Sequence, residues 1–132
     1  MELKTQEWYN ERTQKIISAA IEVHKELGPG LLESVYESCL ECELLNRGLH
    51  VKRQMELPLI YKGEYMGESF RLDLLVDESI IVELKSVECI RDIHEVQLMS
   101  YLRLANKKIG LLINFNVPVL KAGIRRKING YF

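Results

Sequence analysis

The order of helical and extended segments along this 132-residue chain predicts a mixed α/β domain. In this fold class, helices flank one central mixed sheet, here of about four strands. Apolar residues recur at helical spacing near the N-terminus, alternate at period two in the middle, and form a short run near the C-terminus that suits a buried strand. We therefore expect the order α-α-β-β-β-α-β in a single domain over residues 1–132.

Two helices are expected before residue 50. Apolar side chains recur at helical spacing over residues 10–27, and the sequence Gly28-Pro29-Gly30 then ends the helix. A second segment with helical spacing follows this break. Gly48 lies just beyond it, where a helix commonly ends in a left-handed residue that glycine accommodates without strain.

The middle of the chain has the period of a strand. Three strands are expected over residues 57–61, 70–76 and 80–85. Turns at Lys62-Gly63 and Asp77-Glu78 would join them.

A third helix is expected over residues 93–105, because Asp92 and Glu95 resemble a capping box at its start. Residues 109–115 then read as a buried strand, and residues 119–128 as an edge strand or a short helix.

The composition is that of an ordinary soluble domain, with 47% hydrophobic and 28% charged residues. The formal net charge of −1 hides an uneven distribution, because residues 101–132 carry seven Lys and Arg and no Asp or Glu. A basic segment of this kind either solvates a terminal element or binds a polyanion. The candidate nucleic-acid contacts are Lys107, Lys108, Lys121, Arg125, Arg126 and Lys127.

Several classes of protein do not fit the sequence. No stretch approaches the roughly 18 consecutive apolar residues of a membrane span, and the first residues are polar where a signal peptide would be apolar. The three cysteines are an odd number, which suits a reducing compartment. Cys39 and Cys42 have the C-x-x-C spacing but lie in a helical segment without the other ligands of a zinc site. We expect a cytoplasmic protein with no membrane partner.

Charged residues interrupt two strands that are otherwise apolar enough to lie inside a sheet. Residues 70, 72, 74 and 76 form one apolar face of their strand, and Asp73 lies on the other. In the next strand, Glu83 and Lys85 share one face. Such residues are either solvated charges on an exposed hairpin or members of a site.

The length of the loop between these strands decides whether the two acids meet. A two-residue loop at 77–78 places Asp73 opposite Val82, so Asp73 and Glu83 lie on opposite faces of the sheet. A three-residue loop at 77–79 places Asp73 opposite Glu83, with Cβ atoms about 4.5–5.5 Å apart. Carboxylates so close repel each other unless cationic groups, such as a divalent metal and Lys85, lie beside them.

The polar residues follow a pattern along most of the chain. Residues 30–36 read G-x-x-E-x-x-Y, which includes Glu33 and Tyr36. With Asp73, the sequence Glu83-Leu84-Lys85 and the helical pair Gln97 and Tyr101, they closely resemble the GxxExxY family of the PD-(D/E)XK nuclease superfamily. The resemblance extends over residues 16–128, and no position of the pattern is missing. It implies a restriction-endonuclease-like core whose acids gather at one end of the sheet.

The resemblance also implies a metal site. Asp73 and Glu83 would bind Mg²⁺, for which Mn²⁺ can substitute, and Glu33 would act as a further ligand or hold a water. The Leu84 carbonyl would be another oxygen ligand, in keeping with the hard oxygen donors that Mg²⁺ prefers. Lys85 would orient or polarise the attacking water, whose pKa the metal lowers.

The other polar side chains have two interpretations each. Gln97 and Tyr101 would contact a substrate phosphate or hold the catalytic acids, unless they are simply an exposed and a packed side chain. His24 and His94 are as consistent with helix packing as with catalysis. Tyr36 suits a core position, from which its hydroxyl could orient Glu33.

We therefore expect a Mg²⁺-dependent nuclease that hydrolyses phosphodiester bonds, in DNA rather than RNA. Two alternatives stay open: a nucleic-acid-binding or assembly module that keeps the fold without cutting, and a structural protein with solvated acids. A homodimer is consistent with a small nuclease that cuts two strands, although no interface can be identified in the sequence.

Overall fold

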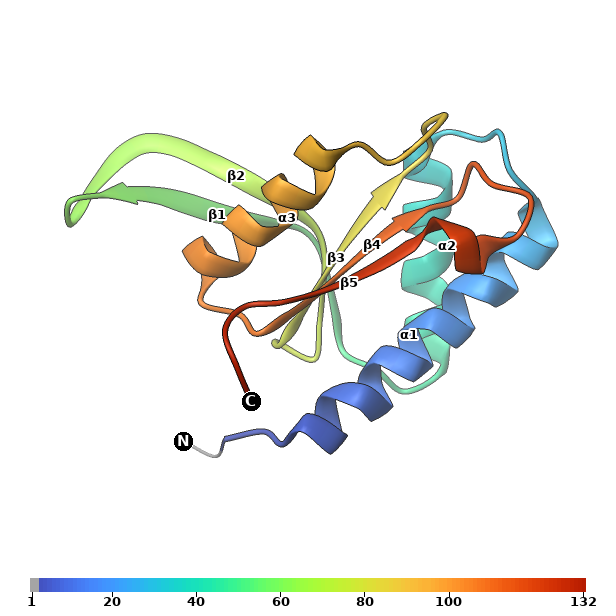
Figure 1. The fold of residues 1–132 in the computed structure, drawn as a ribbon, viewed down its shortest axis with the longest axis horizontal. Helices are drawn as coiled ribbons and strands as arrows, with labels where there is room; N and C mark the ends of the chain where they lie inside the picture. Colours follow the sequence, from blue (N-terminus) through green and yellow to red (C-terminus); the bar gives the residue numbers. More distant parts are fainter. Residues whose placement is uncertain (1–2) are drawn as a thin grey trace.

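The computed structural model describes residues 3–132, which form one five-stranded sheet, three α-helices and a short 3₁₀ helix (Figure 1). The elements are α1 (Gln6–Leu27), α2 (Glu33–Asn46), β1 (Val51–Tyr61), β2 (Glu64–Val76), β3 (Ile80–Lys85), α3 (Asp92–Ala105), β4 (Ile109–Asn114), η1 (Leu120–Gly123) and β5 (Ile124–Ile128). The predicted mixed α/β fold is confirmed. The sheet has one strand more than predicted, because residues 119–128 contain both a short helix and an edge strand.

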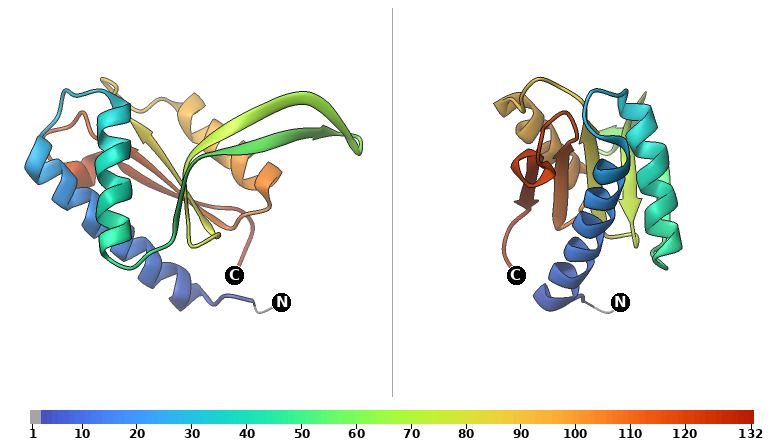
Figure 2. Two further views of the ribbon diagram at one scale, coloured as in Figure 1. Left: turned by 180° about the vertical axis from the view of Figure 1, so that it is seen from behind. Right: turned by 90° about the vertical axis from the view of Figure 1, so that its right-hand side faces the viewer.

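The strands lie in the order β1-β2-β3-β4-β5, and each neighbouring pair is antiparallel except β3 and β4. Helix α3 makes the crossover between these two parallel strands and covers one face of the sheet. Helices α1 and α2 cover the other face (Figure 2). Each face therefore has its own apolar core. The C-terminal ends of the parallel strands β3 and β4 lie side by side at the same end of the sheet.

The first two helices begin and end at local hydrogen-bonding groups. α1 begins earlier than predicted, because the Thr5 hydroxyl accepts the Trp8 N–H at 3.1 Å. α2 is followed by Gly48, whose φ of +82° is left-handed as predicted. No α-helix within residues 3–132 combines the length and the apolar character that a membrane crossing requires.

The predicted capping box of α3 is wrong. Asp92 is the first helical residue, and His94 Nδ1 accepts the Arg91 N–H at 3.0 Å. Glu95 pairs instead with Lys127, with 2.6 Å between Oε1 and Nζ. The lysine on β5 thus attracts the acid that was expected to cap the helix, and a histidine takes the capping position.

Strands β1 and β2 are longer than predicted and form a hairpin arm that projects beyond the rest of the sheet (Figure 1). Their pairing begins at Val51 and Val76 and continues to a turn at Lys62 and Gly63, as predicted. Both turn residues have positive φ, 49° and 83°, which a tight two-residue hairpin turn favours. Residues 61–68 are all exposed, which explains why their sequence lacks the alternation of a half-buried strand.

Strand β2 changes the face that it presents at Asp73. Leu74 packs in the core beneath α1 and α2, whereas Leu72 packs beneath α3. The prediction of a single apolar face over residues 70–76 is therefore wrong. The cause lies in β1, where Gln54, opposite Asp73, has a left-handed φ of +53° that interrupts the regular pleat. Asp73 thus stands at a bend in its strand.

Candidate functional site

The turn between β2 and β3 brings two acids together. Leu74 pairs with Val82, and residues 77–79 form the loop. The same register, continued by one residue, places Asp73 opposite Glu83. Of the two registers compatible with the sequence, the structure has the one that places the acids opposite each other.

The regular backbone pairing of β2 and β3 ends before Asp73 and Glu83. At this point the two carboxylates accept hydrogen bonds from backbone N–H groups. The Asp73 N–H donates to Glu83 Oε2 at 2.8 Å, and the Leu84 N–H donates to Asp73 Oδ2 at 2.8 Å. Each strand thus satisfies a backbone donor of the other strand with a side chain. One oxygen of each carboxylate is held in this way, which leaves the second oxygen for a ligand.

Burial makes this acid pair costly to ionise. Only 5% of Glu83 is exposed. Burial, followed by the charge of Asp73, raises the pKa of Glu83 to about 8. Burial likewise raises the pKa of Asp73. At neutral pH the pair therefore holds a proton, and a divalent cation would replace it.

Lys85 ends β3 two residues beyond Glu83, so both side chains leave the same face of the strand. Its charge acts on Glu83 and Asp73 against the effect of burial, by lowering both pKa values. The backbone is fixed on the β4 side, because the Phe115 N–H donates to the Lys85 carbonyl at 2.9 Å. The ammonium group is therefore presented beside the acid pair.

The buried side chain of Asn114 fixes the segment that follows Lys85. Asn114 is 1% exposed and ends β4. Its Oδ1 accepts the Val87 N–H at 3.1 Å, and its Nδ2 donates to the Val87 carbonyl at 3.0 Å. The chain beyond the E-x-K sequence is thus held against the parallel strand.

The donors at this point suit a divalent cation. Asp73 and Glu83 supply hard carboxylate oxygens, and Mg²⁺ commonly uses one or two carboxylates while it keeps several waters. The predicted three-carboxylate cluster does not form, because no group of three His, Cys, Asp or Glu side chains within residues 3–132 could hold a metal ion. Glu33 is exposed in the first turn of α2. Several effects raise the pKa of Asp73. Burial is the largest, the charge of Glu37 follows, and the charge of Glu33 has a smaller effect.

Helix α3 brings Tyr101 toward the acid pair. Tyr101 is half-buried, and its ring packs on Phe70 with the centroids 5.6 Å apart. Burial raises the pKa of the Tyr101 hydroxyl, and the charges of Glu83 and Asp73 raise it further. Gln97 lies one turn earlier and is exposed. The two side chains therefore differ in burial, and the charges of the acids act on the tyrosine.

Two aromatic residues of α1 and α2 have structural hydrogen bonds. The Tyr36 hydroxyl donates to the Gly28 carbonyl at 2.6 Å and accepts the Leu31 N–H at 3.1 Å. His24 is 9% exposed, and its Nε2 lies 2.8 Å from the Val117 carbonyl oxygen. Tyr36 therefore fixes the Gly-Pro-Gly break that precedes α2, and His24 ties α1 to the loop after β4.

Sequence reasoning missed three residues beside the acid pair. Glu37 is 6% exposed, and its carboxylate accepts from Arg53 Nε at 2.8 Å and from Gln54 Nε2 at 2.6 Å. The Gln54 amide also lies 3.4 Å from Asp73 Oδ1. Glu37 could have been found, because it follows Glu33 by four residues and interrupts the buried face of a helix. The sequence holds no comparable signal for Gln54.

The basic C-terminal segment divides between the two faces of the sheet. Arg125 lies in the same cross-strand row as Glu83, with Leu112 between them. Two strand spacings separate the backbones of Arg125 and Glu83 by about 10 Å. Arg126 leaves the opposite face, where its guanidinium donates to the Asn10 side chain at 2.9 Å. The Arg125 guanidinium donates to the Ala122 and Ile124 carbonyls at 3.1 and 3.0 Å. Its face of the sheet is what makes Arg125 the better placed of the two for a ligand at the acid pair.

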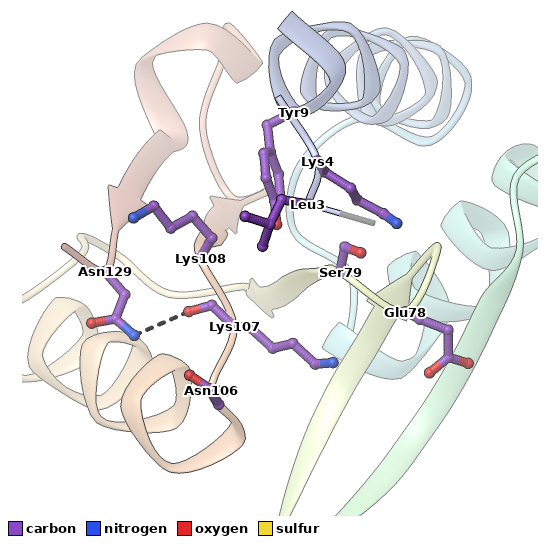
Figure 3. A pocket seen from close by; sticks show the side chains of 9 residues that line it. All are labelled: Leu3, Lys4, Tyr9, Glu78, Ser79, Asn106, Lys107, Lys108 and Asn129. Carbon is purple, nitrogen blue, oxygen red and sulfur yellow. Dashed lines mark hydrogen bonds between the residues drawn. The ribbon is translucent and has the colours of Figure 1, made fainter. Parts of the chain in front are cut away.

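Lys107 and Lys108 directly precede β4, at the opposite end of the strands from the acids. They line a hollow of about 540 Å³ between the start of α1, the start of β3 and the end of α3 (Figure 3). The lysine side chains around it point in different directions, and Asn129 donates to the Lys107 carbonyl at 3.1 Å. Lys121 is exposed in η1, and Lys127 is held in its ion pair. The predicted nucleic-acid contacts thus lie on several surfaces.

The fold and the site define a class of protein: an α/β domain with an Asp at a strand fork and an E-x-K sequence on the next strand. A family model described as the PD-(D/E)XK nuclease superfamily matches residues 10–127. The chain therefore belongs to the PD-(D/E)XK nuclease superfamily, as predicted, and its fold is restriction-endonuclease-like. The narrower GxxExxY family stays a prediction. No curated protein and no solved structure matches the chain significantly.

Proposed function

We propose that the chain is a nuclease that hydrolyses phosphodiester bonds with a divalent cation bound at Asp73 and Glu83. The observation that carries this proposal is the meeting of two acids at a strand fork, with Lys85 two residues along. Adjacent buried carboxylates with raised pKa values stabilise a fold poorly, but they suit a cation. Mg²⁺ is the proposed metal, with Mn²⁺ as a substitute.

The residues around the acid pair have proposed roles. A bound cation would lower the pKa of a coordinated water and stabilise negative charge on the phosphate. Lys85 would position the attacking water and stabilise the charge that develops in the transition state. Gln97 and Tyr101 would contact phosphate oxygens from α3. The Leu84 carbonyl would be a further oxygen ligand, and Glu33 would hold a water from α2.

DNA is the proposed substrate, ahead of RNA. Arg125 is the basic residue that we expect to contact the backbone near the cleaved bond, because it shares a cross-strand row with Glu83. Lys107 and Lys108 are proposed contacts for a more distant part of the substrate. The homodimer and the cytoplasmic location stay predictions from the sequence.

The test is cleavage by the purified protein over a panel of single-stranded, duplex and branched DNA and RNA. We expect cleavage with Mg²⁺ or Mn²⁺, none with EDTA, and none in Asp73→Ala or Lys85→Ala. Glu88→Ala is the matched control, because it removes an exposed acid close in the sequence to the E-x-K segment. Equal activity in both site variants would indicate a contaminating nuclease and contradict the proposal. Salt-dependent binding without turnover would support the non-catalytic binding module instead.

A further inference from the structure

A buried carboxylate that the proposed chemistry does not use lies beside the acid pair. Glu37 is 6% exposed, and hydrogen bonds engage both of its oxygens. Oε2 accepts from Arg53 Nε at 2.8 Å, and Oε1 accepts from Gln54 Nε2 at 2.6 Å. Because both oxygens are engaged, Glu37 is poorly placed to be a metal ligand itself. Its arrangement is that of a group that orients its neighbours.

Gln54 connects this carboxylate to Asp73. Its Nε2 carries two hydrogens, and the nitrogen lies 2.6 Å from Glu37 Oε1 and 3.4 Å from Asp73 Oδ1. The Glu37 contact fixes which end of the amide is the nitrogen and directs the second hydrogen toward Asp73. The residue also has a left-handed φ of +53° within a strand, an arrangement that persists only where surrounding contacts maintain it.

The contact falls on the oxygen of Asp73 that the backbone leaves open. Oδ2 accepts the Leu84 N–H at 2.8 Å, so Oδ1 is the oxygen available to a cation. An amide N–H on one side of Oδ1 limits rotation of the carboxylate and leaves its other lone pair for a ligand. Arg53 offsets part of the charge of Glu37, and the remaining repulsion still raises the pKa of Asp73.

We propose that Glu37 and Gln54 are positioning residues: Glu37 orients the Gln54 amide, and the amide orients Asp73 for the divalent cation. This inference rests on the proposed function. Mutation of a residue that forms a hydrogen bond with a metal ligand typically lowers metal affinity or activity by about 10- to 100-fold. We expect an effect of that size at Gln54 and at Glu37.

The sharpest variant is Gln54→Asn. Asparagine tolerates a left-handed backbone better than most residues, so the variant keeps the fold. Its amide is one methylene shorter and no longer reaches both Glu37 and Asp73. We expect Mn²⁺ binding, followed by electron paramagnetic resonance, to weaken by about 10- to 100-fold. The Mg²⁺ concentration for half-maximal cleavage should rise by a similar factor. Saturating Mg²⁺ should restore kcat, whereas it would not restore activity to an unfolded variant.

Glu37→Gln and Glu41→Gln form a matched pair of variants. Glu37→Gln keeps the size of the side chain but weakens its hold on Gln54, so we expect the same loss of Mn²⁺ affinity. Glu41 lies one turn further along α2 and approaches the same Arg53, with 3.7 Å between Oε1 and Nη1. Its substitution should leave Mn²⁺ affinity unchanged. Unchanged affinity in Gln54→Asn, in a protein that binds Mn²⁺, would overturn the inference.

A metal-free measurement separates this inference from the proposed function. In the wild-type protein with EDTA, NMR should show a Gln54 side-chain amide that exchanges slowly. Its resonances should shift in Asp73→Asn and in Glu37→Gln, but not in Glu41→Gln. A protein that binds no Mn²⁺ yet shows these shifts would contradict the nuclease proposal and support the positioning network. A Gln54 amide that responds to neither substitution would overturn the network, whatever the protein cleaves.

Discussion

The raised pKa of Glu83 leads to a prediction that needs no substrate. Burial and the charge of Asp73 raise the pKa of Glu83 from 4.5 to about 8 in the folded protein. The native state therefore holds this proton more tightly than the unfolded chain, so the free energy of unfolding falls as pH rises between about 4.5 and about 8. At about 1.4 kcal/mol per pKa unit, the loss is about 5 kcal/mol across this range.

Glu83→Gln should remove this pH dependence. Glutamine resembles the protonated acid, and its amide oxygen can still accept the Asp73 N–H that Glu83 Oε2 accepts at 2.8 Å. We expect the variant to match the wild type near pH 5 and to exceed it in the free energy of unfolding by up to about 5 kcal/mol at pH 9. With an unfolding entropy of about 2.1 cal/mol/K per residue over 132 residues, this corresponds to a Tm higher by roughly 18 °C.

The assay is thermal unfolding by circular dichroism between pH 5 and pH 9 in EDTA. Glu68→Gln, an exposed substitution in the hairpin arm, is the control and should follow the wild type. A constant difference between Glu83→Gln and the wild type at every pH would refute the reasoning, because it would mean that Glu83 titrates alike in the folded and unfolded chains. Saturating Mg²⁺ at pH 9 should narrow the gap, since a cation stabilises only the carboxylate form.

Three further predictions concern the metal, the substrate and the fold. The pKa of Glu83 is about 8, so the cation must displace its proton at lower pH. Mn²⁺ affinity measured by calorimetry should therefore fall by about tenfold for each pH unit below that value. An affinity that does not change with pH would contradict the site. Arg125→Ala should reduce the steepness of log DNA affinity against log salt concentration by about one, as measured by fluorescence anisotropy with duplex DNA. Arg126→Ala should leave this slope unchanged, because its guanidinium forms a hydrogen bond on the other face of the sheet. The same slope in both variants would contradict this placement. Tyr36→Phe loses two hydrogen bonds of a buried hydroxyl and should lower the free energy of unfolding in urea by about 1–3 kcal/mol, while Tyr61→Phe, on the exposed arm, should not.

The sequence predicts the elements best where they contact a core. Residues 10–27 fall inside α1, because a core on one side imposes a helical spacing of apolar residues. Residues 80–85 coincide with β3, a short run that is buried between the two cores. The exposed end of the hairpin arm lacks such a core, and the predicted strands there are too short. Local turn chemistry is also predicted well, since Gly48 and Gly63 both have positive φ.

The site is harder to predict because it depends on contacts between distant segments. The sequence allows two registers for Asp73 and Glu83, and the loop conformation at residues 77–79 decides between them. The change of face at Asp73 depends on the backbone of Gln54, nineteen residues away in the sequence. A residue pattern records which acids are present, but their orientation is set by a neighbouring strand and by a buried acid on a helix.

The acid pair is better explained by ligand binding than by folding. A buried carboxylate with a raised pKa lowers the stability of the folded protein at neutral pH and above, and a glutamine or an apolar residue would remove that cost. The fold nevertheless surrounds the pair with polar groups that favour its charged form: two backbone N–H groups and the ammonium of Lys85. These groups only reduce the repulsion between Asp73 and Glu83, whereas a divalent cation would remove it. The stabilisation that Mg²⁺ gives to the folded protein should therefore grow as pH rises toward about 8, in the same range in which the metal-free protein becomes less stable.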